Sequence, residues 1–131
     1  MKEHKAIIPE EMRGIHDRFH YSPAVRVGET LYVAGQVGRD NNLTVIADPE
    51  AQYVRAFENL KLVLTTAGTD LDHVVDFISF HTSIDDLMMF IDVKNRFFVR
   101  EPYPPWTVIG VSALAMPGLR VELKCTAIMP R

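Results

Sequence analysis

Hydrophobic positions along this chain follow two periods, and the change from one to the other separates predicted strands from predicted helices. Residues 24–27 and 30–37 are rich in β-branched and aromatic side chains, and only Gly28 and Glu29 stand between them. That composition and spacing predict a hairpin of two antiparallel strands, with Gly35 interrupting the second. Residues 5–9 form a short apolar run that predicts an edge strand, followed by a polar, turn-rich loop as far as His20.

A helical period begins after Asp48. Five apolar or aromatic positions recur at helical spacing: Tyr53, Phe57, Leu60, Leu64 and Ala67. Asp48 suits the N-cap, Pro49 suits the first turn, and Gly68 suits the end of such a helix. Residues 49–67 are therefore predicted to be helical.

Strand and helix signals alternate through the rest of the chain. Residues 73–82 predict a long strand, and residues 107–111 and 119–128 predict two more. A second helix is expected to begin near Ser83 and to end before Pro102. One side of this helix would carry Leu87, Ile91, Lys94 and Phe98. The predicted order is β-β-β-α-β-α-β-β.

The last strand sorts its side chains between two faces, because successive residues of a strand point to opposite sides of a sheet. One face takes the apolar set Val121, Leu123, Cys125 and Ala127, and the other takes the polar set Arg120, Glu122, Lys124 and Thr126. Two helices are too few to cover both faces of six strands. We therefore expect an α+β fold with two helices on one face, while the other face lies in solvent or against another subunit.

Composition and charge narrow the class of protein. At 131 residues, 47% of them apolar, the chain fits one folded domain spanning residues 1–131. The formal charge of −3 is spread without a run of like charges, which disfavours a nucleic-acid partner. No stretch has the length of a signal-peptide core or a membrane span, so a cytoplasmic protein without a membrane partner is expected.

Metal and thiol chemistry receive no support from the sequence. The five histidines form no i, i+4 pair on a predicted helix, and no cluster of thiolates accompanies them. Cys125 is the only cysteine, which excludes an internal disulfide and suits a reducing compartment. Its place in the apolar set predicts an inert, protonated thiol. We expect no metal and no other cofactor.

Four longer motifs occur in order along the chain. They are YSPAVRVGETLYVAGQVG at residues 21–38, AFENLKLVLTTAG at residues 56–68, YPPWTVIGV at residues 103–111 and VELKCTAI at residues 121–128. Together these motifs resemble the Rid family (reactive intermediate deaminases, also called YjgF) over nearly the whole chain. YPPWTVIGV and the FHTS of residues 80–83 resemble a YjgH-like branch that also has tryptophan at the position of Trp106.

The resemblance implies a chorismate-mutase-like (YjgF-type) fold, in which a six-stranded mixed sheet packs against two helices. It also implies a homotrimer with a ligand cleft between neighbouring subunits. In deaminating members, an arginine that opens the penultimate strand holds the substrate carboxylate. A glutamate on the last strand and backbone groups near the turn position a water molecule, which attacks the imine or enamine carbon so that ammonia leaves.

Three site residues of the family match this chain. The cleft tyrosine, the turn glycine and the last-strand glutamate fall on Tyr21, Gly35 and Glu122. The resemblance makes Glu122 the catalytic candidate. Tyr21 and Gly35 become candidates for substrate binding.

Three other positions depart from the pattern. The cleft serine is Ala34 here, the arginine is Trp106, and the cysteine two residues later is Val108. An arginine binds a carboxylate through two charged hydrogen bonds, whereas an indole has one N–H donor and a wide apolar face. A standard 2-imino acid would therefore lose its main anchor, although all three positions remain substrate-binding candidates.

Each of these candidate residues has two interpretations, one structural and one functional. Trp106 packs as a loop anchor or forms a stacking wall for an apolar ligand. Glu122 positions water in a dry cleft, or is a solvated or trimer-face carboxylate that pairs with Arg120 or Lys124. Tyr21 contacts a ligand, or packs its ring at a strand entry.

His81 is the last candidate for substrate binding. It alternates in phase with Val75, Phe77 and Ser79, which predicts a buried face and a core histidine. The other interpretation has His81 supply the polar contact that Ala34 lacks.

Two functions from different classes follow. The first is a trimeric enzyme that hydrolyses a reactive imine or enamine metabolite, with Glu122 and a water molecule. The second is a non-catalytic trimer that binds or senses a small apolar metabolite against Trp106. An endoribonuclease or translation inhibitor fits less well, because the chain is acidic and has no basic, aromatic stripe.

Overall fold

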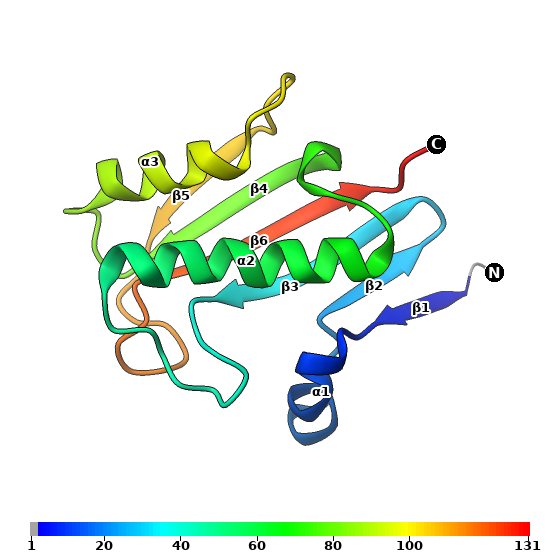
Figure 1. Ribbon diagram of the computed structural model, residues 1–131, viewed down its shortest axis with the longest axis horizontal. Helices are drawn as coiled ribbons and strands as arrows, with labels where there is room; N and C mark the ends of the chain where they lie inside the picture. The colour runs from blue at the N-terminus through cyan, green and yellow to red at the C-terminus, as the bar shows by residue number, and fades with distance from the viewer. Residues whose placement is uncertain (1–2) are drawn as a thin grey trace.

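The computed structural model describes residues 3–131, which form one six-stranded sheet with its long helices on one side (Figure 1). The strands are β1 (His4–Ile7), β2 (Ala24–Val27), β3 (Thr30–Val37), β4 (Val74–His81), β5 (Trp106–Gly110) and β6 (Val121–Ile128). The helices are α1 (Arg13–Phe19), α2 (Pro49–Ala67) and α3 (Leu87–Phe97). Short 3₁₀ turns at Glu10–Met12 and Leu71–His73 precede α1 and β4.

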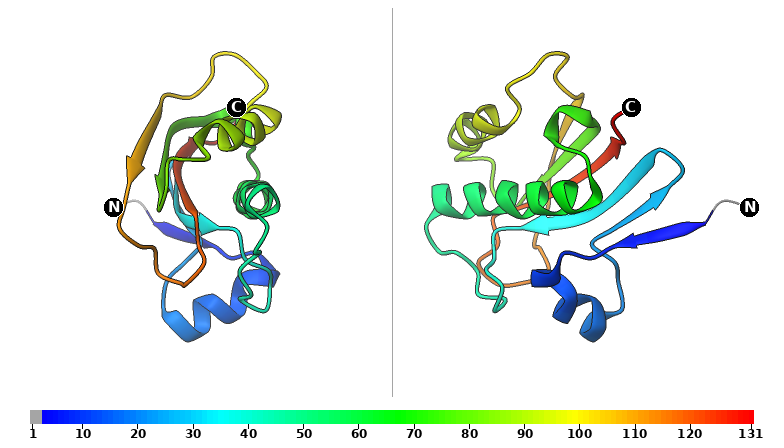
Figure 2. Two further views of the ribbon diagram at one scale, coloured as in Figure 1. Left: turned by 90° about the vertical axis from the view of Figure 1, so that its left-hand side faces the viewer. Right: turned by 45° about the vertical axis from the view of Figure 1, so that its right-hand side comes forward.

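The sheet is mixed, with the order β1-β2-β3-β6-β4-β5. All neighbouring strands are antiparallel except β4 and β5, which run parallel. The helices α2 and α3 lie side by side on one face, and the edge-on view leaves the opposite face without either of them (Figure 2). The predicted α+β fold with two helices on one face is confirmed.

The predicted hairpin is confirmed with the bounds expected from the sequence. β2 and β3 pair antiparallel across Gly28, whose φ of 61° lies in the region that glycine adopts without strain. Further along, the pairing of β3 with β6 shifts register between Val33 and Gln36. Gly35 therefore sits in a β-bulge, which explains why it interrupts the strand pattern.

Helix α2 also has the predicted bounds and caps. The Asp48 carboxylate accepts a hydrogen bond from the backbone N–H of Ala51 at 2.9 Å, and Pro49 occupies the first turn. Gly68 ends the helix at φ 91°. The buried side of α2 packs against the alternate residues of β6 predicted to face inward, all of which are buried: Val121, Leu123, Cys125 and Ala127.

The loop predicted as far as His20 is wrong, because α1 lies within it. None of the α1 residues is buried. A helix with no buried face carries no apolar stripe, so hydrophobic periodicity could not reveal it.

Helix α3 begins at Leu87, not near Ser83. The Ser83 hydroxyl accepts a hydrogen bond from the Asp85 N–H at 3.2 Å, which makes a local turn instead of a helix cap. The buried residues of α3 are Phe90 and Val93. Of the predicted side, Leu87 packs against the core and Phe98, at the end of the helix, is buried, whereas Ile91 and Lys94 are only partly buried.

Candidate functional site

Glu122 lies on the face of the sheet that the helices leave uncovered. Its neighbours Val121 and Leu123 are fully buried on the helix side, so strand alternation directs Glu122 to the other side. Its carboxylate lies over Gly35, and a Cβ added at Gly35 would collide with the Glu122 side chain. The absence of a side chain at the bulge thus makes room for the carboxylate.

Glu122 has neither a hydrogen-bond donor nor an ion-pair partner within residues 3–131, although it is partly buried. Arg120 instead pairs with Asp86, with 3.1 Å between Nη1 and Oδ2. The Lys124 ammonium donates to the carbonyl oxygen of Val33 at 3.1 Å. Within one subunit, Glu122 therefore pairs with neither Arg120 nor Lys124.

Tyr21 and an arginine that the sequence did not single out lie at the same bulge. Arg39 Nη2 donates to the Tyr21 hydroxyl at 3.2 Å, and Nη1 donates to the Met116 sulfur at 3.3 Å. Tyr21, Gly35 and Arg39 line a small hollow of about 20 Å³. Val37 pairs directly with Glu122, and Arg39 comes two residues after Val37. Residues two apart along a strand point to the same face, so this spacing is the signal that could have identified Arg39.

Ala34 completes this group. Its backbone N–H donates to the carbonyl oxygen of Pro23 at 2.9 Å, and its own carbonyl oxygen accepts from Gln36 Nε2 at 3.2 Å. These bonds hold the bulge next to the segment that carries Tyr21. We call Tyr21, Ala34, Gly35, Arg39 and Glu122 the bulge site.

Trp106 lies on the opposite face of the sheet from Glu122. It pairs in parallel register with Phe77, which is fully buried beneath the helices, so both side chains face α2 and α3. The indole N–H donates to the Ser79 hydroxyl at 2.9 Å, and its ring lies 6.0 Å from that of Phe90. Its one polar donor is thus already used inside the protein.

Val108 and His81 lie near Trp106, because all three are neighbours of Ser79. Val108 pairs with Ser79 in the β4–β5 register, and the Trp106 N–H donates to the Ser79 hydroxyl. His81 is fully buried, and its Nε2 lies 2.7 Å from the Ser79 hydroxyl oxygen. Burial lowers the pKa of His81, while the nearby Asp86 carboxylate opposes that shift. His81 therefore lies in the core and does not approach Ala34.

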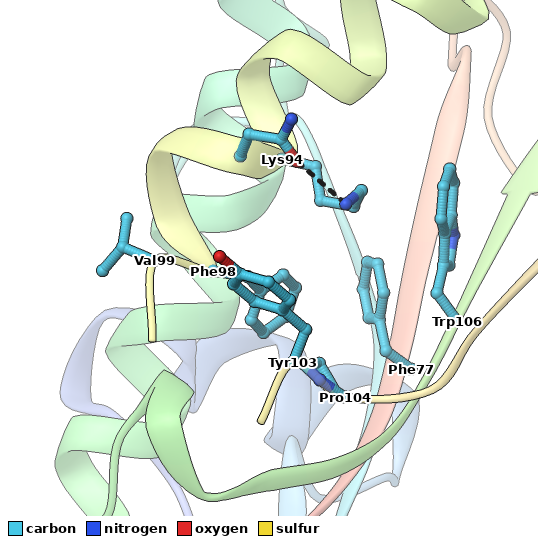
Figure 3. A pocket seen from close by; sticks show the side chains of 8 residues that line it. Phe77, Lys94, Phe98, Val99, Tyr103, Pro104 and Trp106 are labelled. Atoms are coloured by element: carbon cyan, nitrogen blue, oxygen red, sulfur yellow. Dashed lines mark hydrogen bonds between the residues drawn. The ribbon is translucent and has the colours of Figure 1, made fainter. Parts of the chain in front are cut away.

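A pocket of about 440 Å³ opens beside Trp106, between β5 and α3 (Figure 3). Its walls include Phe77, Lys94, Phe98, Tyr103, Pro104 and Trp106, and we call it the tryptophan pocket. The Lys94 ammonium lies 4.7 Å from the centre of the Trp106 ring system. The pocket thus combines aromatic surface with one positive charge.

Metal binding and a reactive thiol have less support from the structure than the bulge site and the tryptophan pocket. Within residues 3–131 there is no group of three His, Cys, Asp or Glu side chains that could hold a metal ion. Burial raises the pKa of the Cys125 thiol to about 12, so its side chain is a protonated part of the core. No helix among the described residues has both the length and the hydropathy needed to cross a membrane.

The sequence and the fold both match known proteins. A family model described as Endoribonuclease L-PSP matches residues 14–129. The chain is 38% identical over 134 residues to the RutC family protein YjgH of Escherichia coli (strain K12), covering 99% of this chain and 98% of that protein. It is 32% identical to a 2-iminobutanoate/2-iminopropanoate deaminase of Dermatophagoides farinae, covering 83% and 85%. The solved structure of Protein YJGH superposes with a TM-score of 0.90 at 37% identity, covering 98% of each chain.

Proposed function

The chain belongs to the Rid (YjgF) family, and on that premise we propose that it hydrolyses a reactive imine or enamine of a small metabolite. Glu122 is the catalytic residue of this proposal. Tyr21, Ala34, Gly35 and Arg39 are the proposed substrate-binding residues of the bulge site.

The unpaired carboxylate of Glu122 is the observation that supports this function. A glutamate that is partly buried and lacks a partner has both oxygens available to accept hydrogen bonds from a water molecule. Water attacks the carbon of the C=N bond while Glu122 accepts a proton from it. Glu122 passes this proton to the imine nitrogen, which gives a neutral carbinolamine. Glu122 then transfers the hydroxyl proton to the amino nitrogen, the C=O bond forms as the C–N bond breaks, and ammonia leaves with a carbonyl compound as the other product. An enamine first tautomerises to the imine.

A homotrimer would bring the two groups of candidate residues together. Trp106 and Glu122 face opposite sides of one sheet, so a single subunit does not place both beside one ligand. In the proposed trimer, the tryptophan side of one subunit meets the bulge site of its neighbour at a cleft. The uncovered face, which carries Glu122, supports contact with a neighbouring subunit on the bulge-site side, because it exposes the large apolar side chains of Tyr32, Ile109 and Ile128.

The substrate of this proposal is not a standard 2-imino acid bound in the usual way. Relatives named 2-iminobutanoate/2-iminopropanoate deaminase share the family. This chain has Trp106 where the resemblance implies the carboxylate-binding arginine, and the Trp106 N–H already bonds to Ser79. A substrate whose reacting carbon carries a larger apolar group fits this chain better.

A second candidate function is a non-catalytic trimer that binds a small metabolite. The tryptophan pocket supports it, because an aromatic pocket of about 440 Å³ lies within the usual range for small ligands. The name of the family model, Endoribonuclease L-PSP, suggests RNA as a third possibility. The net charge of −3 favours a small molecule over RNA.

Ammonia release tests the enzyme proposal. Imines and enamines with apolar side chains are generated in the assay, and the native protein is compared with Glu122→Gln, which keeps the shape and removes the carboxylate. We expect a loss of about 100-fold or more in kcat/KM, the usual contribution of general acid–base catalysis. Glu58→Gln, at an exposed position on α2, is the matched control. Equal rates for the native protein and Glu122→Gln would remove Glu122 from the mechanism.

A further inference from the structure

The tryptophan pocket contains a positive charge without a negative partner. Lys94 Nζ donates to the side-chain oxygen of Asn95 at 3.0 Å and lies 4.7 Å from the centre of the Trp106 ring system. No carboxylate of residues 3–131 lies within ion-pair distance of Lys94. The charge is therefore balanced only by a neutral amide and an aromatic face.

The surroundings of Lys94 make this arrangement costly for the free protein. The side chain is partly buried between α3 and β5, and burial lowers the pKa of its ammonium group. An ammonium that has lost part of its hydration gains more from an arriving anion than an exposed lysine does. A ligand with a negative group would thus find in Lys94 a preformed, unpaired counter-ion.

The remaining walls fit an apolar body attached to that negative group. Phe77, Phe98, Tyr103 and Trp106 provide ring faces or edges, and Pro104 closes the lower side in the close-up view (Figure 3). Rings prefer stacked or edge-to-face contacts with other rings, which favours an aromatic ligand over a highly polar one. The volume of about 440 Å³ accommodates one ring with a short side chain.

We propose that the tryptophan pocket binds small arylalkyl carboxylates, with Lys94 as the counter-ion of the carboxylate and Trp106 as a stacking wall. This inference specifies the ligand class for the second candidate function and rests on that function. It does not require hydrolysis by Glu122. The ammonia assay and the binding assay below therefore succeed or fail separately.

Fluorescence of Trp106, the only tryptophan, reports binding directly. The native protein is titrated with 3-phenylpropanoate and with 3-phenylpropanamide, which has nearly the same shape without the charge. We expect the carboxylate to bind at least about ten-fold more tightly, which is the effect of one modest charge-assisted contact. Added salt should weaken binding of the carboxylate and leave that of the amide nearly unchanged.

Variants of Lys94 then test whether this side chain causes the preference for the carboxylate over the amide. Lys94→Met keeps the length of the side chain and should make the carboxylate and the amide bind equally, whereas Lys94→Arg should retain the preference. Lys61→Met, at an exposed position on α2, is the control for losing a lysine. Lys94→Gln replaces Lys94→Met if the latter fails to fold.

Two outcomes would overturn the inference, and they differ in meaning. Equal affinity of the native protein for the two compounds would leave a binding pocket but contradict the anionic ligand class. No response to either compound, measured also by calorimetry, would contradict the pocket as a site for arylalkyl ligands while leaving the hydrolysis proposal untouched.

Discussion

The carboxylate of Glu122 lies over the backbone of Gly35, in the space that the Cβ of any other residue at position 35 would occupy. The two residues come from different strands, β6 and β3, and they meet at the point where the pairing of these strands shifts register. The bulge and the missing side chain act together. They leave a carboxylate partly buried without pairing it to a basic residue.

Gly35→Ala is predicted to reduce activity far more than stability. The added methyl group would collide with the end of the Glu122 side chain, which is flexible and only partly buried, so the carboxylate can rotate away. We expect the free energy of unfolding to fall by less than about 1 kcal/mol, at the low end for overpacking. Ammonia release should fall to the level of Glu122→Gln.

Gly38→Ala is the matched comparison, because a Cβ there would collide with the backbone carbonyl of Gln52 in α2. Backbone cannot rotate away, so this variant should lose about 1–3 kcal/mol in denaturant unfolding. A Gly35→Ala protein that keeps full activity would show that the position of Glu122 over Gly35 is not used.

Much of the fold could be predicted because the relevant signals are local. The hairpin of β2 and β3 needed only a two-residue connection between β-rich runs, and α2 needed only Asp48, Pro49 and an apolar stripe. Helix α1 escaped prediction because it buries no residue. The start of α3 was misplaced because Ser83 bonds within its own turn, and sequence alone does not distinguish that turn from a cap.

The candidate site was predictable only in part. The motifs identified Gly35 and Glu122, and their contact follows from strand pairing and the bulge. They did not reveal that Trp106 faces the helices, because that depends on its parallel register with Phe77, a long-range pairing. None of the motifs assigns a role to Arg39. Its guanidinium reaches the Tyr21 hydroxyl only in the folded chain.

The buried imidazole of His81 predicts a loss of stability in mild acid. Burial lowers its pKa below the ordinary value of 6.5 in the folded protein, so the unfolded chain binds a proton first as the pH falls. Stability is then full above pH 6.5 and declines below it, towards the lowered pKa of the folded state. The charge of the Asp86 carboxylate raises the pKa of His81, which limits the effect without reversing it.

Denaturant unfolding between pH 7 and pH 5 measures this decline. The slope for one proton approaches about 1.4 kcal/mol per pH unit. His81→Leu should flatten the profile in this range, and His4→Gln, at an exposed position on β1, should not. Parallel profiles for the native protein and His81→Leu would show that another group controls stability in this range.

The hydrogen bond between Arg39 and Tyr21 predicts that these two side chains act as a unit at the bulge site. Among residues 3–131, the Arg39 guanidinium donates hydrogen bonds to the Tyr21 hydroxyl and the Met116 sulfur and forms no ion pair, so it orients the phenol without being held by a carboxylate. Arg39→Gln and Tyr21→Phe each remove this bond. Each should raise KM for the hydrolysed imine several-fold and change kcat little, because the bond positions substrate before the chemical step.

The double variant decides between a shared and a separate role. If the two side chains act through their hydrogen bond, either single variant already removes that bond. The free-energy loss calculated from kcat/KM for the double variant should then be smaller than the sum of the two single losses by about 0.5–1 kcal/mol. Arg26→Gln is a control, since that guanidinium bonds to Gly28 and Glu29 in the hairpin turn. Strict additivity would mean that Tyr21 and Arg39 contribute independently. An unchanged KM in both single variants would place the substrate away from this side of the bulge.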